Sequence, residues 1–312
     1  MKKNLLLPVL CMVLLLTACT GGLAPARTAW YTFTDDAGQQ VVLYEKPKKV
    51  AVLFSSFADI WVTAGGDVAV TVGESVERGF AGEDALLVDG GAGKTIDAEL
   101  LLAAQPDFVI GSADLEGQAA ACRLAEKAGI PSAMLRVDSL QDYLRVLKIF
   151  TEITGNDEAY TIYGEQVQAQ VDALLEMTAA GEEKEILFVR AGSKASATKA
   201  KTAAENFVCV MLNELGAHNI AEDAPVLLDG LSLEEILLRD PDFIFISTMG
   251  SEAEAKAYME SVFEEEGWKD LAAVKEKNYA FLPKELFHFK PNARWAEAYT
   301  YLAELLYPEL MK

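Results

Sequence analysis

The chain has 312 residues, of which 51% are hydrophobic and 24% charged, and its formal net charge is −21. This length is enough for two lobes of ordinary domain size, each with its own hydrophobic core. So acidic a surface repels nucleic acid and anionic lipid headgroups, which excludes nucleic acid from the expected partners.

The first nineteen residues predict a lipoprotein signal peptide. Lys2 and Lys3 form a basic start, an apolar run follows over 5–16, and small residues precede Cys19. The run is shorter than the ~20 residues of a membrane-spanning helix, so a transmembrane anchor is the weaker alternative. The pattern resembles a bacterial lipobox, which implies cleavage before Cys19 and lipidation of its thiol. We therefore expect an extracytoplasmic protein, held at the outer face of the cell membrane by its lipid alone, with residues 20–28 as a flexible tether.

Strands and helices alternate through residues 29–139, which we expect to form an N-terminal α/β lobe. The predicted elements are a hairpin over 30–43, strands over 50–54, 68–72, 108–110 and 133–137, and helices from Ala58 and over 118–128. The polar stretch 74–83 predicts a loop. Buried apolar strands separated by helices predict a mainly parallel sheet that is covered on both faces.

One pattern in this lobe, over 95–112, occurs again over 230–247. When Pro106 is aligned with Pro241, Glu99 falls on Glu234 without gaps. Each copy reads as a short helix, a proline stop and a buried strand. The predicted helix N-caps are Asp97 in the first copy and Ser232 in the second, where Ser232 and Glu235 also match a capping box. The two halves of the chain therefore share one plan.

Between the halves, residues 140–183 predict helices and no strand. Apolar residues recur at helical spacing over 140–153, and a second helix is expected over 158–178. A C-terminal α/β lobe is expected over 184–312, with strands over 186–189, 243–246 and 279–282 and helices over 203–215, 252–266 and 295–307. The predicted fold is thus α/β, with two Rossmann-like lobes of mainly parallel sheet joined by one long interdomain helix.

Two cysteines remain in the predicted lobes. Cys122 and Cys209 each lie in a predicted helix of a different half. A disulfide between them is one alternative, and two buried apolar thiols are the favoured one.

With the repeat, the helical linker and the lipobox, the chain resembles the class III substrate-binding lipoproteins of ABC importers for iron–siderophore complexes, haem and cobalamin. The residues that carry the resemblance are Lys48 to Ala51, Glu99 with Pro106 and Asp107, Gly129 to Pro131, Leu215 and Gly216, Asn219 and Ile220, Glu234 with Pro241 and Asp242, and Trp268 with Leu271 and Ala273 to Lys275. The resemblance implies a monomer without cofactor or catalytic activity that binds a small-molecule metal chelate in the cleft between its lobes. It also implies that Glu99 and Glu234 dock on arginines of a permease, which works with ATPase subunits. The alternative is that both are solvated first-turn residues stabilised by the helix dipole.

Open α/β sheets bind ligands at the carboxyl ends of their strands, and this rule selects the candidate cleft residues. They are Ser55, Ser56, Phe57, Arg78, Phe80, Lys94, Ser112, Arg190, Ser193, Lys194, Lys199, Lys201, Met249, Phe287 and His288. The segment 190–201 contains four cations and no acidic residue, which favours an anionic chelate through charge-assisted hydrogen bonds. A solvated basic loop is the alternative.

Other chemistries fit the sequence less well. The stretch 90–95 is similar to a phosphate-binding loop, but the first glycine of that motif is replaced by Val88. His218 and His288 are the only histidines and lack the clustering of a bare metal site, so no directly bound metal is expected. His288 as an axial haem ligand is kept as an alternative. Ser55 and Ser56 lack a nucleophile elbow and a histidine partner, which argues against a surface enzyme or chelate-processing protein. An adhesion or sensory lipoprotein is a third option.

Overall fold

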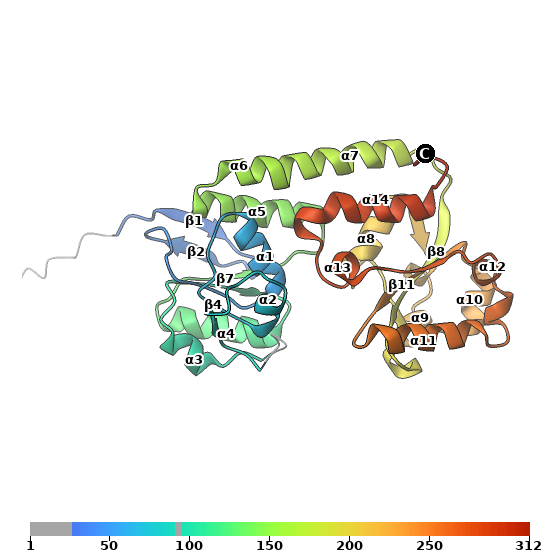
Figure 1. The fold of residues 1–312 in the computed structure, drawn as a ribbon, viewed down its shortest axis with the longest axis horizontal. Helices are drawn as coiled ribbons and strands as arrows, with labels where there is room; N and C mark the ends of the chain where they lie inside the picture. The colour runs from blue at the N-terminus through green and yellow to red at the C-terminus, as the bar shows by residue number, and fades with distance from the viewer. Residues whose placement is uncertain (1–26, 91–94) are drawn as a thin grey trace, which may run out of the picture.

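Two five-stranded sheets form the centres of two lobes in the computed structural model, which describes residues 27–90 and 95–312 (Figure 1). The predicted signal peptide with Cys19, most of the predicted tether, and Lys94 lie outside the described residues. In the N-terminal lobe all five strands are parallel, in the order β5-β4-β3-β6-β7. In the C-terminal lobe β10-β8-β11-β12 are parallel, and β9 pairs with β8 in the antiparallel direction.

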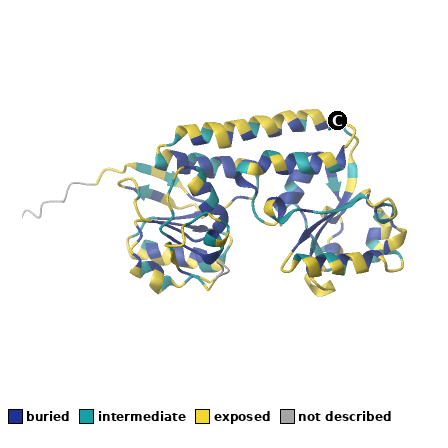
Figure 2. Cartoon of the chain, viewed as in Figure 1, coloured by how far each residue is buried: buried dark blue, intermediate teal, exposed yellow. Residues whose placement is uncertain are grey.

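The strands are short and mostly buried. Their bounds are β1 Tyr31–Thr34, β2 Gln40–Leu43, β3 Val50–Val52, β4 Val70–Thr71, β5 Leu86–Leu87, β6 Phe108–Ser112, β7 Ser132–Leu135, β8 Lys184–Ala191, β9 Lys199–Ala200, β10 Ala217–Asn219, β11 Phe243–Thr248 and β12 Tyr279–Phe281. β1 and β2 form the predicted antiparallel hairpin, in which the carboxylate of Asp35 accepts hydrogen bonds from the N–H groups of Ala37 and Gln39. Figure 2 shows the central strands of both sheets as buried, as the apolar runs predict.

Helices cover both faces of each sheet. Their bounds are α1 Ser55–Thr63, α2 Gly73–Glu77, α3 Ala98–Ala103, α4 Glu116–Lys127, α5 Leu140–Thr154, α6 Asp157–Tyr160, α7 Gln166–Thr178, α8 Phe207–Glu214, α9 Val226–Asp229, α10 Leu233–Arg239, α11 Glu252–Phe263, α12 Ala272–Lys275, α13 Lys284–Phe287 and α14 Trp295–Leu306. In the N-terminal lobe α3 and α4 pack on one face of the sheet, and α1 and α5 on the other. Among the described residues, no helix is both long enough and apolar enough to cross a membrane.

The two copies of the repeat keep the same structural role. Asp107 and Asp242, which follow the aligned prolines, each accept from the backbone at the start of a central strand. Asp107 accepts from the N–H groups of Lys48 at 2.7 Å and Lys49 at 2.9 Å, and Asp242 accepts from that of Glu185 at 2.9 Å. The Pro-Asp pair therefore fixes a short helix to the parallel strand beside it in both lobes.

The helix starts of the repeat differ. Asp97 caps α3 as predicted, because its carboxylate accepts from the Leu100 N–H at 3.0 Å. The capping box predicted for α10 is wrong, because the Ser232 side chain forms no capping bond. Glu235 instead accepts from Arg239 at 2.8 Å, so a helical i,i+4 ion pair replaces the capping interaction.

The stretch between the lobes contains two helices, which with α14 form a layer over both lobes; α5 lies beside α6, and α7 lies beside α14 (Figure 1). The second runs through α6, a π-helical segment Thr161–Glu165 and α7, and in Figure 1 it extends from the N-terminal to the C-terminal lobe. Gly164 lies in the π segment, where an added Cβ would come within 3.1 Å of the Tyr160 ring. The linker helix therefore packs against α5 and α14 and does not stand free in solvent.

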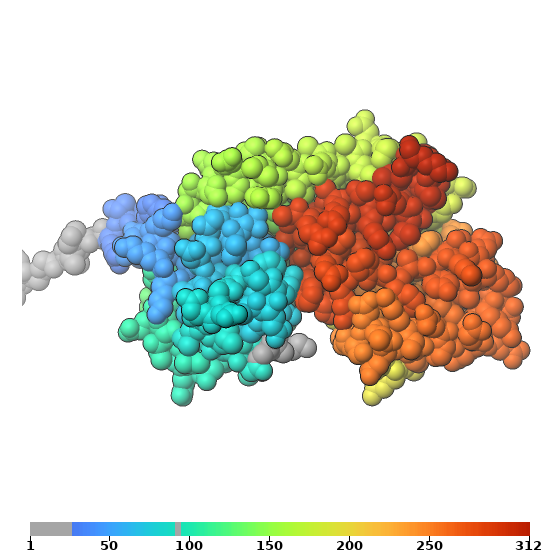
Figure 3. Space-filling view, in the orientation of Figure 1, coloured from blue at the N-terminus to red at the C-terminus, as the bar shows by residue number. Residues whose placement is uncertain are grey.

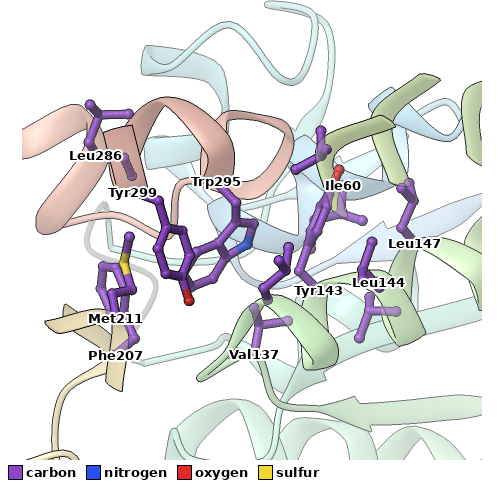
Figure 4. Packing of buried hydrophobic residues seen from close by; sticks show 14 of the residues in the cluster. Ile60, Val137, Tyr143, Leu144, Leu147, Phe207, Met211, Leu286, Trp295 and Tyr299 are labelled. Carbon is purple, nitrogen blue, oxygen red and sulfur yellow. The ribbon is translucent and has the colours of Figure 1, made fainter. Parts of the chain in front are cut away.

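The largest hydrophobic core crosses from one lobe to the other through this layer. Figure 4 shows Trp295 and Tyr299 of α14 between residues of α8 in the C-terminal lobe and residues of α5 and α1 in the N-terminal lobe. Trp295 is fully buried, and its ring meets that of Phe207 edge to face at 5.7 Å between centroids. The lobes are thus joined by a common core as well as by the chain.

Both cysteines of the lobes are free and buried, as favoured from the sequence. Burial raises the pKa of the Cys122 thiol to about 12, and burial also raises the pKa of the Cys209 thiol well above its usual value. Neither thiol is activated as a nucleophile.

Candidate functional site

A hollow of about 710 Å³ lies between the two lobes. The N-terminal lobe contributes Phe54, Phe57, Ser112, Asp114, Leu115, Arg136, Val137 and Asp138, and the C-terminal lobe contributes Arg190, residues 203–207 and Lys290. Figure 3 shows the molecule notched between the two lobes, beneath the helical layer. We call this hollow the main cleft.

The main cleft continues into two smaller hollows that share Lys290 with it. The first, which we call the alcove, has a volume of about 170 Å³ and is lined by Arg190, Glu205, Asn206, Phe207, Ser247, Phe287, His288 and Lys290. The second has a volume of about 480 Å³ and includes Asp59, Arg78, Phe80, Phe289 and Arg294. The loop that carries Lys290 therefore borders all three hollows.

Parallel strands place the polar groups of the cleft. Ser112 ends β6, Arg136 follows β7, Arg190 lies near the end of β8, and Ser247 lies near the end of β11. Parallel strands present their carboxyl ends at one edge of a sheet, and in this molecule that edge of each sheet faces the other lobe. The cleft therefore lies where this class of fold binds ligands.

Most cations of the cleft are already paired. Lys290 Nζ lies 2.8 Å from Asp138 Oδ1, which is an ion pair across the lobes, and 4.6 Å from the centroid of the Phe207 ring. Arg136 contacts Asp114 at 2.6 Å. For Arg190, by contrast, no carboxylate of the described residues lies within ion-pair distance, and burial lowers the pKa of its guanidinium.

Arg78 forms a second, more enclosed cationic group. Its guanidinium donates to the Ser55 hydroxyl at 3.0 Å and lies 4.8 Å from the Phe80 ring centroid and 4.0 Å from that of Phe289. Burial lowers the pKa of Arg78, while the charges of Asp59 and Glu74 oppose this shift. Ser55 in turn donates to the Glu74 carboxylate. The aromatic rings hold the guanidinium in place by cation–π contact.

The structure brings eight of the predicted site residues to these hollows or their walls. Phe57, Ser112 and Arg190 line the main cleft, Phe287 and His288 line the alcove with Arg190, Arg78 and Phe80 line the second hollow, and Ser55 supports Arg78 from behind. Ser56 is buried beneath the cleft, where its carbonyl accepts from Asn292 at 2.9 Å.

Five predicted residues do not line the hollows. Ser193 and Lys194 are exposed, Lys199 lies on β9, Lys201 pairs with Glu205 at 2.9 Å, and Met249 is exposed beyond the end of β11. The reason is β9, which folds back on β8 and carries the basic segment away from the cleft after Arg190. Of that segment, only Arg190 faces the other lobe.

Four prominent cleft residues were not among the candidates: Arg136, Asp138, Phe207 and Lys290. Arg136 directly follows β7 but lies inside the strand predicted over 133–137, so the strand-end rule did not select it. Phe207 and Lys290 carry no such signal, because Phe207 begins helix α8 and Lys290 follows the short helix α13.

His288 lines the alcove, whose lining residues belong to the C-terminal lobe. Partial enclosure and the positive charges of Lys284 and Arg190 lower its pKa, while a hydrogen bond with the Thr248 backbone and the charge of Glu74 oppose the shift. No group of three or more metal-ligating side chains occurs in residues 27–90 and 95–312. The cleft thus offers aromatic surface, cations and hydrogen-bond donors for an intact small molecule.

Glu99 and Glu234 occupy the first turns of α3 and α10, the matching helices of the two lobes. Both are exposed, and neither forms an ion pair within the part of the chain that the structure describes. Their carboxylates are therefore accessible on corresponding elements of the two lobes.

Comparison with known proteins agrees with this geometry. Solved structures with the same fold include an ABC transporter substrate-binding protein from Listeria monocytogenes (19% identity, covering 85% of this chain and 100% of that chain, TM-score 0.67). They also include Staphylococcus aureus SirA complexed with staphyloferrin B (17%, 88% and 98%, 0.67) and the haem-binding protein RhuT from Roseiflexus (18%, 84% and 99%, 0.66). No curated protein matches the chain significantly.

The predicted fold class, two α/β lobes with mainly parallel sheets, is confirmed. A family model described as periplasmic binding protein matches residues 50–286, which span both sheets and the helical layer between them. The resemblance found in the sequence is thereby confirmed: the chain belongs to the periplasmic binding protein family.

Proposed function

We propose that this protein captures a metal chelate, with an iron–siderophore complex as the first candidate, in its interlobe cleft and delivers it to an ABC permease. The observation that carries the proposal is the hollow of about 710 Å³ at facing strand ends, which combines phenylalanines with Arg190, an arginine that has no carboxylate partner among the described residues. The fold similarity to SirA, solved with staphyloferrin B, supports a chelate as the ligand. Members of this family are extracytoplasmic solute-binding proteins of ABC importers rather than enzymes.

The residues that line the hollow suit a chelate better than a bare ion. A metal ion would need several carboxylate, imidazole or thiolate ligands, and such a group is absent from residues 27–90 and 95–312. A chelate already satisfies its metal, so it needs only apolar walls and a few polar contacts for orientation. Phe54, Phe57 and Phe207 supply the walls, and Arg190 supplies a cation.

Intrinsic fluorescence gives a direct test of binding. Trp295 packs on Phe207, a wall of the main cleft, so a ligand against Phe207 should change the emission. The mature protein should be titrated with a panel of ferric chelates, haemin and cobalamin, and the Trp295→Phe variant should lose most of the signal but keep the affinity in calorimetry. If no member of the panel binds when ferric citrate is present as a competitor at millimolar concentration, and ferric citrate itself does not bind, chelate capture is contradicted.

Docking is the second part of the proposal. We assign it to Glu99 and Glu234, because both are exposed and lie on matching helices of the two lobes. Glu99→Gln combined with Glu234→Gln should abolish uptake into vesicles that contain the permease and ATPase, while chelate affinity stays unchanged. The matched control is Glu116→Gln with Glu254→Gln, which removes exposed first-turn carboxylates of α4 and α11 instead. Intact uptake by the Glu99 and Glu234 double variant would remove the docking role.

The lipid anchor completes the proposal. Thioether-linked lipid on Cys19 would hold the protein at the outer face of the membrane, and the residues before β1 would serve as its tether. Cys19→Ala should release the protein from the membrane fraction, and metabolic labelling with palmitate should mark the wild-type chain only. Labelling of the variant at the same level would contradict anchoring at this residue.

Haem is the second candidate ligand. His288 lines the alcove beside the main cleft, and the structural neighbour RhuT is a haem-binding protein. If haemin is bound through this imidazole, its Soret band should shift on binding, and His288→Ala should remove the shift.

A further inference from the structure

The alcove combines three features that point to an acidic group of the ligand. Arg190 forms its cationic wall without a carboxylate partner among the described residues, and burial lowers the pKa of this guanidinium. A partly buried guanidinium without a counter-ion is unfavourable, because it loses hydration and gains no compensating pair. The unfavourable charge is relieved when an anion enters from the cleft.

Neutral donors accompany this charge. Ser247 is 4% exposed and lines the alcove, and its hydroxyl forms no hydrogen bond with the residues that the structure describes. Asn206 caps α8 through its side-chain oxygen, which accepts from the Val208 N–H at 2.9 Å, so its amide N–H groups are left to donate. The alcove also lies at the N-terminus of α8, which favours negative charge.

Two further cations beside the alcove are paired with carboxylates. Lys290 pairs with Asp138, and Lys201 pairs with Glu205, which is the acidic residue of the alcove wall. In the adjoining main cleft, Arg136 pairs with Asp114. Among the residues that line the alcove, Arg190 is therefore the cation without a carboxylate partner in the described part of the chain, and the volume of about 170 Å³ matches one small acidic group rather than several.

We propose that the alcove is the subsite for a single acidic arm of the ligand, a carboxylate or phosphate, with Arg190 as its counter-ion and His288 as a donor that takes up a proton when the arm binds. This rests on the proposed function, because it assigns the body of the chelate to the main cleft. The cleft thereby selects chelates that carry one acidic arm on a largely uncharged body over polyanionic ones.

The proton uptake follows from the charges that face His288. Burial is the largest cause of the lowered pKa of His288, and the charges of Lys284 on α13 and Arg190 on β8 lower it further. A hydrogen bond with the Thr248 backbone and the charge of Glu74 on α2 oppose the shift, and Lys290 and Glu205 share the alcove wall but are paired. An anion bound at Arg190 cancels part of the positive potential, so the imidazolium becomes more favourable. Binding of the arm is therefore tighter at a pH below the raised pKa of His288 than above it.

The chain offers a simple test, because it has only two histidines. Protein labelled with ¹³C-histidine should be titrated with pH by NMR in the absence and presence of inorganic phosphate, and then of acetate, at constant ionic strength. His218, which lies 2.9 Å from Asp223, is the internal control. We expect the pKa of His288 to rise by about one unit with either anion, and the His218 resonances to show no response to the anions.

Matched variants separate the subsite from general charge effects. Arg190→Gln should remove the anion-induced shift of His288, whereas Lys194→Gln, the same charge change at an exposed residue of the same segment, should leave it intact. Arg190→Lys keeps the positive charge, so it provides a second variant in case Arg190→Gln fails to fold, and it should retain part of the His288 shift. Equal shifts of both histidines, or an undiminished His288 shift in Arg190→Gln, would overturn the subsite. Chelate binding without the His288 response would remove only the subsite, and the response without chelate binding would remove only the proposed function.

Discussion

Removal of the Asn292 side chain tests how firmly the two lobes are joined. Asn292 is fully buried, and its amide nitrogen donates to the Ser56 carbonyl at 2.9 Å and to the Asp59 carboxylate at 2.8 Å. A hydrogen bond to a charged group contributes about 1.5–3 kcal/mol, and one to a neutral group about 0.5–1.5 kcal/mol, so their loss should cost about 3 kcal/mol. Asn292 has φ of 51°, and alanine in this left-handed region adds about 1 kcal/mol.

The assay is urea unfolding of Asn292→Ala, followed by tryptophan fluorescence. We expect the free energy of unfolding to fall by about 4 kcal/mol with an unchanged dependence on urea concentration, because the unfolded state exposes the same surface. Asn292→Gly is the matched control, since it loses the same hydrogen bonds but tolerates positive φ, and it should be about 1 kcal/mol more stable than Asn292→Ala. A loss below about 1 kcal/mol in Asn292→Ala would refute the view that these bonds join the lobes.

Three further predictions follow from the same region. Trp295→Ala should lower the free energy of unfolding by about 3–5 kcal/mol, and both lobes should still unfold in one transition. Trp295→Phe should cost far less, because the indole Nε1 has no hydrogen-bond partner among the described residues. Two separate transitions in calorimetry would contradict a common core. A double-mutant cycle of Lys290→Met and Asp138→Asn should give a coupling energy below about 1 kcal/mol that decreases with added salt, because Asp138 is half exposed; a salt-independent coupling above this value would show a desolvated pair. Burial raises the pKa of Asp59, so the folded state binds this proton at higher pH than the unfolded chain does; its contribution to stability should be complete below its unfolded pKa and be lost as pH rises through the folded pKa. Asp59→Asn should flatten that part of the pH–stability curve, and an unchanged slope would assign it to other groups.

The central strands could be predicted from the sequence because their signal is local. Apolar runs such as 108–110 and 243–246 are too short for a helix and are bounded by turn residues, which identifies strands buried on both faces. The edge strands β5, β9 and β10 have only two or three residues each, and their strand conformation comes from pairing with a neighbour in space. The helices α2 and α13, of five and four residues, lie in stretches that read as loops, because elements this short have no periodic pattern of apolar residues.

The site could be predicted only where it follows the ends of strands. Arg190 and Ser112 are in the main cleft because they end central parallel strands, which is a topological rule. The lysines after Arg190 could not be placed, because a two-residue antiparallel strand turns the chain away from the cleft. The pair of Lys290 with Asp138 joins residues 152 positions apart, and no local pattern encodes it.

The position of α14 sets the order in which this molecule can be assembled. The helix consists of residues Trp295–Leu306, almost the last of the chain, yet its aromatic side chains fill the space that both lobes share. Each sheet can pair its own strands before α14 has packed, but the hydrophobic core that the lobes share is incomplete until this helix is in place. A variant that lacks residues 293–312 should therefore have two loosely connected lobes with exposed apolar inner surfaces, and it should be prone to proteolysis and aggregation.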